Sequence, residues 1–148
     1  MSITTIDEQI IATLKKISGP LARLSLFVIF FWFGILKVLG TSPANQMVES
    51  LQQKTLPFLS FSTFIILFGI YEMIIGLLFI IPRLERVAIA ILIPHIIMTS
   101  LPLIFLPGMT WEGFLVPTME GQYIIKNLVI VALALATGAR LEPLKPKP

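Results

Sequence analysis

Charged residues are scarce in this chain of 148 residues: 13% are Asp, Glu, Lys or Arg, whereas about 25% is usual for a soluble domain. Hydrophobic residues make up 56% of the chain, and the mean hydropathy is +0.94. This balance excludes an ordinary soluble domain. The formal net charge is +3, but the basic residues form no cluster on a soluble face, so the basicity does not indicate nucleic-acid binding.

The chain has no cysteine and a single histidine, His95. Without cysteine it can form no disulfide and cannot itself carry out thiol–disulfide exchange. One histidine and no thiolate cannot supply bis-histidine haem ligation or a closed zinc site within one chain, so neither haem nor metal is expected. The sequence also lacks a glycine-rich phosphate loop, a GxSxG motif and an HExxH motif. It therefore identifies no catalytic residue.

Long apolar stretches dominate what remains. A membrane-spanning helix needs about 20 apolar residues, and four stretches reach or approach this length: 21–39, 58–82, 87–106 and 122–139. We therefore expect an all-α fold, with residues 1–148 forming a single membrane domain built as a four-helix bundle in the lipid bilayer.

The distribution of basic residues predicts the orientation. Eight of the eleven Lys and Arg residues fall in the N-terminal segment, in the loop between the second and third spans, or after the last span: Lys15, Lys16, Arg23, Arg83, Arg86, Arg140, Lys145 and Lys147. Short cytoplasmic segments are enriched in Lys and Arg. Both termini and the loop between spans 2 and 3 are therefore predicted to lie in the cytoplasm.

Two short helices and a tail are predicted outside the spans. Residues 5–17 combine an apolar stripe at helical spacing with a capping-box spacing, and Gly19 and Pro20 follow as a stop signal. We expect an amphipathic helix there, which either lies along the cytoplasmic interface or packs across the inner mouth of the bundle. A second helix is predicted over about 43–53 in the outer loop, and residues 142–148 are expected to be disordered.

Polar side chains inside the spans are the candidate functional residues. An ionisable group at mid-membrane costs at least about 2.5–3.5 kcal/mol, so it is expected to face the bundle interior and to have a partner. A rise of about 1.5 Å per residue puts Glu72 and His95 near the midplane. We predict an inner polar layer of Glu72, His95, Thr99 and Asn127, and an outer layer of Lys37, Tyr123, Lys126 and Glu120.

Each of these residues also has a structural interpretation. Lys37 and Lys126 can extend to the outer head groups, and Tyr123 can serve as an interface anchor. His95 directly follows a proline, and its side chain can satisfy the carbonyl that the proline leaves free. Glu72 can be a protonated carboxyl that makes a structural hydrogen bond. The sequence leaves these alternatives open.

Three stretches, RLSLFVIFFWFGILKVLG, YEMIIGLLFIIPRLERVAIAIL and YIIKNLVIVALAL, resemble the DoxX-like membrane protein family. That family has an Arg-led first span ending in G-x-x-K and a second span with E-x-x-x-G before a loop arginine. The GQYIIKN stretch is similar to the related YkgB group. The resemblance covers about residues 21–140 and implies a four-helix inner-membrane protein, with these matching positions: Gly34, Lys37, Glu72, Gly76, Arg83, Arg86, Lys126 and Asn127.

The resemblance also implies a class of function. Members of the family are associated with redox processes, including a thiosulfate–quinone oxidoreductase subunit and partners in oxidant defence. The absence of cysteine argues against covalent handling of sulfur by this chain. Our leading hypothesis is therefore a redox-associated inner-membrane protein that binds a quinone or another small apolar ligand in the bundle core, with any further cofactor supplied by partners.

In this hypothesis Glu72 and His95 handle protons or hydrogen-bond a carbonyl, while Lys37 and Lys126 polarise an anionic group from the outer side. Two alternatives stand beside it. The chain can be a small transporter or proton-coupled permeability protein, which needs a homo-oligomer to make room for a path. It can also be a non-catalytic assembly or anchoring subunit that docks a protein partner through its N-terminal helix.

Overall fold

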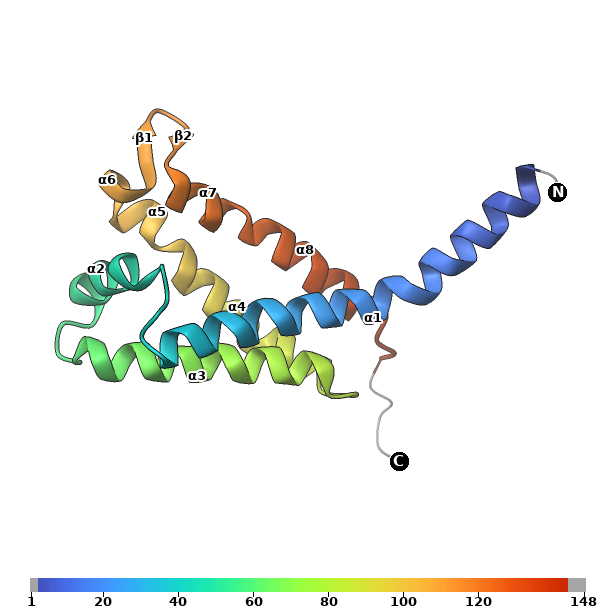
Figure 1. Cartoon of the computed structure of the whole chain (residues 1–148), viewed down its shortest axis with the longest axis horizontal. Helices are drawn as coiled ribbons and strands as arrows, with labels where there is room; N and C mark the ends of the chain where they lie inside the picture. The colour runs from blue at the N-terminus through green and yellow to red at the C-terminus, as the bar shows by residue number, and fades with distance from the viewer. Residues whose placement is uncertain (1–2, 144–148) are drawn as a thin grey trace.

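The computed structural model describes residues 3–143, and most of these residues are helical (Figure 1). Within this range four helical segments are long and apolar enough to cross a membrane: Ile3–Val38, Phe61–Ile80, Glu85–Phe105 and Met119–Gly138. The prediction that the four apolar stretches form helices long and apolar enough to cross a membrane is thus confirmed. The predicted tail, 142–148, lies mostly outside the described residues.

The first helix, α1 (Ile3–Val38), is continuous, and the expected stop at Gly19 and Pro20 is wrong. Proline lacks an N–H and leaves the carbonyl four residues earlier without its helical donor. That carbonyl belongs to Lys16, in an exposed part of the helix, where water or head groups can satisfy it. A helix of 36 residues is about 54 Å long, longer than the hydrocarbon core of about 30 Å. Its N-terminal part extends beyond the other helices (Figure 1).

A short helix, α2 (Asn45–Thr55), follows and leads into α3 (Phe61–Ile80). The helix predicted over 43–53 is therefore present, shifted by two residues. The buried Gln52 amide donates to the carbonyls of Leu56 and Leu59 at 2.6 and 2.7 Å, which fixes the chain reversal between the two helices. Ser60 caps α3, because its hydroxyl accepts from the backbone N–H of Thr63.

The third apolar segment consists of α4 (Glu85–Ser100) and α5 (Pro102–Phe105), and a proline begins the second piece. A single turn of helix, α6 (Pro107–Thr110), and a hairpin of β1 (Trp111–Gly113) with β2 (Val116–Pro117) then cover this end of the molecule. The fourth span is also divided, into α7 (Met119–Ile125) and α8 (Asn127–Gly138).

Helices α1 and α3 run side by side and pack more extensively than any other pair among the described elements (Figure 1). Glycines make this possible. A Cβ added to Gly34 would lie 2.5 Å from the carbonyl oxygen of Gly69, and one added to Gly69 would lie 2.6 Å from the carbonyl oxygen of Gly34. Gly76 meets the backbone of α1 near Phe27 and Phe31 in the same way. Small residues at a helix crossing let two backbones approach closely.

Helix α8 contacts both α1 and α4, and α4 also contacts α3. The side chains that all four helices contribute to the interior form one apolar layer: Leu26, Phe30, Ile75, Phe79, Ala88, Leu92 and Ala134. Large apolar side chains elsewhere point outward, such as Leu128 and Val129 on α8. An outer surface of this kind matches lipid better than water.

Candidate functional site

Three ionisable side chains from three helices meet in the interior. The ammonium of Lys37 on α1 donates to Oε2 of Glu72 on α3 at 2.6 Å. The other carboxylate oxygen, Oε1, lies 3.0 Å from Nε2 of His95 on α4. Glu72 therefore sits between two nitrogen bases and links three spans through one carboxyl group.

The glycine contact between α1 and α3 positions two of these side chains, Lys37 and Glu72. Glu72 shares a helical face with Gly69, three residues earlier, and Gly76, four residues later. A Cβ added to Gly69 would lie 3.0 Å from the Cβ of Lys37, so the lysine stem packs directly on α3. One turn along that face, the carboxylate meets the ammonium. Lys37 thus points into the protein and does not extend to the outer head groups.

Burial strengthens these contacts and makes the loss of either partner costly. The side chains of Lys37 and Glu72 are 7% and 6% exposed, and that of His95 is 5% exposed. A buried charge without its partner is costly, because nothing replaces the water it has lost. The ring of Phe68 stacks on the imidazole at 5.3 Å, and Phe30 meets it edge-on at 5.2 Å. The aromatic rings hold the imidazole in place beside the carboxylate.

The two ring nitrogens of His95 have different surroundings. Nε2 faces Glu72, whereas Nδ1 is buried and, among residues 3–143, has no hydrogen-bond partner. The ring of His95 does not cap the carbonyl of Ala90, which Pro94 leaves without its helical donor. The hydroxyl of Tyr71 donates to the neighbouring carbonyl of Ile91. A buried polar nitrogen left unpaired is rare and calls for an explanation.

A cavity of about 130 Å³ lies beside the trio. Its polar wall consists of Glu72, His95, Thr99 and Asn127, and its apolar wall of Ile29, Phe30, Phe33 and Ile130. The amide Nδ2 of Asn127 donates to the hydroxyl of Thr99 at 3.4 Å, and that hydroxyl donates to the carbonyl of His95 at 2.9 Å. The four residues of the predicted inner layer therefore line one cavity.

The predicted outer layer is not assembled. Lys37 belongs to the inner site, while Tyr123, Lys126 and Glu120 are exposed. Lys126 lies at the junction of α7 and α8, and its ammonium lies 5.0 Å from the centre of the Tyr123 ring, three residues earlier on the same helical face. These side chains lie on the face of the helix that is exposed at the surface of the protein, so they do not line the cavity.

The aromatic residues of the site, among them Phe68 and Tyr71, were missed from the sequence. Phe68 lies four residues before Glu72 and so shares its face, and its ring lies 5.4 Å from the ammonium of Lys37 as well as against His95. Helical spacing would have placed Phe68 there. Tyr71 lies next to Glu72 in sequence, and only the packing of α3 on α4 shows that it reaches Ile91.

The chemistry available here is proton transfer and hydrogen bonding. A carboxylate between an amine and an imidazole can exchange a proton with either, and the unpaired ring nitrogen of His95 can donate or accept a further hydrogen bond. Among residues 3–143, no group of three or more His, Cys, Asp or Glu side chains could hold a metal ion. No protein-family model matches the chain, and no curated protein and no solved structure matches it significantly.

Proposed function

We propose that the chain is a DoxX-like inner-membrane protein whose four spans form a bundle, with both termini in the cytoplasm. The cavity beside His95 binds the carbonyl edge of a quinone or of another small apolar molecule. Its role is redox-associated, and any further cofactor belongs to a partner. The two motifs that carry the family resemblance support the proposal. The GILK stretch of α1 packs against the EMIIG stretch of α3, since Gly34 touches Met73 and Lys37 binds Glu72.

The observation that carries the ligand proposal is the unpaired Nδ1 of His95 next to a cavity with polar walls. A neutral imidazole that donates from Nε2 to Glu72 offers Nδ1 as an acceptor, and a protonated one offers it as a donor. The amide of Asn127 adds a second donor on the same cavity. An apolar slot with a few convergent polar groups is the usual form of a small-molecule site.

The size of the cavity limits the ligand. A volume of about 130 Å³ is below the roughly 300–1,000 Å³ of sites that enclose a drug-sized molecule. It accepts one edge of a ring, with the remainder of the ligand in the bilayer. Phe33 forms part of the wall and is half exposed on α1, so an apolar ligand reaches the cavity from the lipid side by displacing this ring.

In this proposal the cation that polarises the site is Lys37, through Glu72, and Lys126 has no part in it. The orientation is supported by the basic residues at one end. Arg23, Arg83, Arg86 and Arg140 all lie near the ends of spans on the side of the two termini, as the positive-inside rule expects for the cytoplasmic face.

A second candidate function, a non-catalytic anchoring subunit, is favoured by the N-terminal part of α1. This part extends beyond the other helices, and its apolar residues Ile6, Ile10, Leu14 and Ile17 are exposed (Figure 1). An apolar stripe on a protruding helix suits contact with a partner helix. In that case Glu72 stabilises the fold and the cavity holds only water.

Transport through a single chain has less support. The buried apolar layer that contains Leu26, Ile75 and Phe79 lies between the cavity and the end of the molecule that carries the termini. A path for a polar substrate would have to cross this packed layer. A transporter would therefore need a path between copies of the chain.

The first experiment identifies bound small molecules. The protein is purified in mild detergent, and its organic extract is analysed by mass spectrometry for wild type, Glu72→Gln and Asn127→Leu. Lys126→Gln is the matched control, because this residue neighbours Asn127 but is exposed and does not line the cavity. We expect a quinone in wild type and in Lys126→Gln, and its loss or reduction by about tenfold in the other two variants, since losing the charge of Glu72 or the amide of Asn127 from the cavity wall costs about 1–3 kcal/mol.

Binding of added short-chain ubiquinone to each folded variant gives an independent measure. If wild type carries no quinone and binds none, and Glu72→Gln only lowers stability, the ligand proposal fails and the anchoring function is preferred. Loss of the ligand in Lys126→Gln as well would place the site elsewhere.

A further inference from the structure

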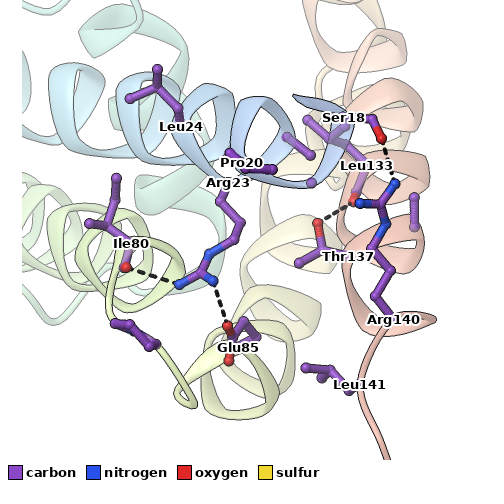
Figure 2. Close-up of a pocket in the computed structure, with 14 residues that line it drawn as sticks. Ser18, Pro20, Arg23, Leu24, Ile80, Glu85, Leu133, Thr137, Arg140 and Leu141 are labelled. Atoms are coloured by element: carbon purple, nitrogen blue, oxygen red, sulfur yellow. Dashed lines mark hydrogen bonds and ion pairs between the residues drawn. The ribbon is translucent and has the colours of Figure 1, made fainter. Parts of the chain in front are cut away.

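A second, larger pocket lies at the other end of the helices. Its volume is about 610 Å³, and it forms where the C-terminal ends of α3 and α8 and the N-terminal end of α4 meet residues 18–24 of α1 (Figure 2). It shares no lining residue with the cavity beside His95. The proposed ligand of that cavity therefore leaves this pocket unexplained.

Every guanidinium nitrogen of one of its two arginines, Arg23, has a partner. Arg23 donates from Nε to the carbonyl of Phe79 at 2.7 Å and from Nη2 to that of Ile80 at 2.9 Å. Its Nη1 lies 2.8 Å from Oε1 of Glu85. Arg23 thus satisfies carbonyls at the end of α3 and is neutralised by the acid of the pocket (Figure 2).

Within the part of the chain that the structure describes, no acid pairs with the other arginine, Arg140. Arg140 donates from Nη2 to the hydroxyl of Ser18 at 2.6 Å, and within residues 3–143 this is the only hydrogen bond that the structure gives its guanidinium. A guanidinium has five N–H donors, so most of them remain available. Glycine allows this placement, since a Cβ on Gly19 would lie 2.5 Å from Nη1 of Arg140. The guanidinium reaches the hydroxyl of Ser18 beside Leu133 (Figure 2).

The pocket combines this cation with an apolar wall. Leu24, Leu133, Ala136 and Leu141 line it together with the hydroxyl-bearing Ser18 and Thr137. A free inorganic anion would use the arginine and leave the apolar wall in contact with water. An anionic head group attached to an acyl chain uses both.

We propose that this pocket binds an anionic phospholipid, with the phosphate on the guanidinium of Arg140 and the hydroxyl of Ser18, and with an acyl chain along Leu24, Leu133 and Ala136. Arginine binds phosphate through parallel charge-assisted hydrogen bonds. Basic pockets between membrane helices are recurrent head-group sites. The lipid bridges α1 and α8 at the point where Arg140 already joins them through Ser18.

The test uses the full chain, stripped of lipid in mild detergent, and native mass spectrometry with added phosphatidylglycerol or phosphatidylcholine. We expect one tightly bound phosphatidylglycerol on wild type and about tenfold weaker binding to Arg140→Gln, from the loss of a charged hydrogen-bonding group. Arg83→Gln is the matched control. It removes one positive charge at the same end of the molecule as the pocket, from an exposed residue that does not line it. This variant is expected to change phosphatidylglycerol binding by less than about twofold.

A second variant separates binding from folding. Ala136→Phe leaves both arginines in place and fills the apolar part of the pocket, so it too is expected to weaken phosphatidylglycerol binding by about tenfold. Each variant is first checked for wild-type helical content by circular dichroism, and Arg140→Lys, which keeps the charge, is expected to recover part of the affinity.

Two results would overturn the proposal. One is equal phosphatidylglycerol binding by wild type, Arg140→Gln and Ala136→Phe. The other is tight binding of inorganic phosphate alone, dependent on Arg140 but not affected by Ala136→Phe, which would make the pocket a site for a free anion.

Discussion

The ion pair between Lys37 and Glu72 gives the most direct test of the interior site. We predict that removing both charges destabilises the protein no more than removing either one alone. Lys37→Met keeps the length of the lysine stem without its charge. Glu72→Gln keeps the shape of the carboxyl group and can still hydrogen-bond to both of its neighbours, so the charge is the main property that changes.

The magnitude follows from the geometry. At the Nζ–Oε2 distance of 2.6 Å, two unit charges attract by about 6 kcal/mol at an effective dielectric constant of about 20. Desolvation of both groups offsets much of this, and breaking a buried pair by removing one member typically costs about 3–5 kcal/mol. Each single variant of Lys37 or Glu72 is therefore expected to lose about 3–5 kcal/mol of unfolding free energy. The double variant is expected to lose no more than either single one.

The measurement is a double-mutant cycle. Unfolding is followed by circular dichroism as sodium dodecyl sulfate is titrated into mixed micelles, for wild type, Lys37→Met, Glu72→Gln and the double variant. We expect a coupling energy of at least about 3 kcal/mol, because each single variant leaves one buried charge without its partner.

The Arg23–Glu85 pair is the matched control within the same chain. Its nitrogen–oxygen distance of 2.8 Å is similar, but its side chains are 26% and 9% exposed, so water screens it more. The cycle of Arg23→Met and Glu85→Gln is expected to give a coupling of about 1 kcal/mol or less. If the Lys37–Glu72 coupling is no larger than this, or if Lys37→Met is harmless, the two charges are not paired in the interior and the description of the site is wrong.

Three further predictions concern the scaffold, each measured by the same titration. Gly69→Val is expected to destabilise by about 3 kcal/mol, because its Cβ would lie 2.6 Å from the carbonyl oxygen of Gly34; no loss of stability would disprove the close crossing. Tyr71→Phe is expected to lose about 1 kcal/mol, since its hydroxyl donates to a carbonyl of α4; an unchanged stability would mean that water replaces the bond. Gly40→Ala is expected to cost about 1–2 kcal/mol, because Gly40 has φ +73 with no atom within 4 Å of the added Cβ. The control is Gly108→Ala, at a helical position equally free of neighbours, which is expected to stabilise the protein by about 0.5–1 kcal/mol. If alanine stabilised the protein at both positions, or destabilised it at both, the left-handed conformation at Gly40 would be contradicted.

The sequence by itself determined the class of the protein. A long apolar stretch in lipid can adopt few conformations, because its backbone N–H and C=O groups must be hydrogen-bonded within the protein. A helix meets this requirement within one segment. The same reasoning identified Glu72 and His95, since an ionisable residue at mid-membrane needs a partner in the interior. Helix ends were less well predicted. Gly19 and Pro20 have the composition of a stop, yet α1 continues through them.

Only the tertiary structure decided which partners meet. Depth along a helix placed Lys37 with Lys126 in an outer layer, but depth contains no information on the direction in which a long side chain extends. The close contact of Gly34 with Gly69 turns Lys37 along α3 to Glu72, and the rotation of α7 and α8 leaves Lys126 exposed. The pairing of Arg140 with Ser18 joins residues 122 positions apart. Helical periodicity gives the face on which a residue lies, whereas the contact between two faces depends on how the helices pack, and that is set by the shapes of all the side chains between them.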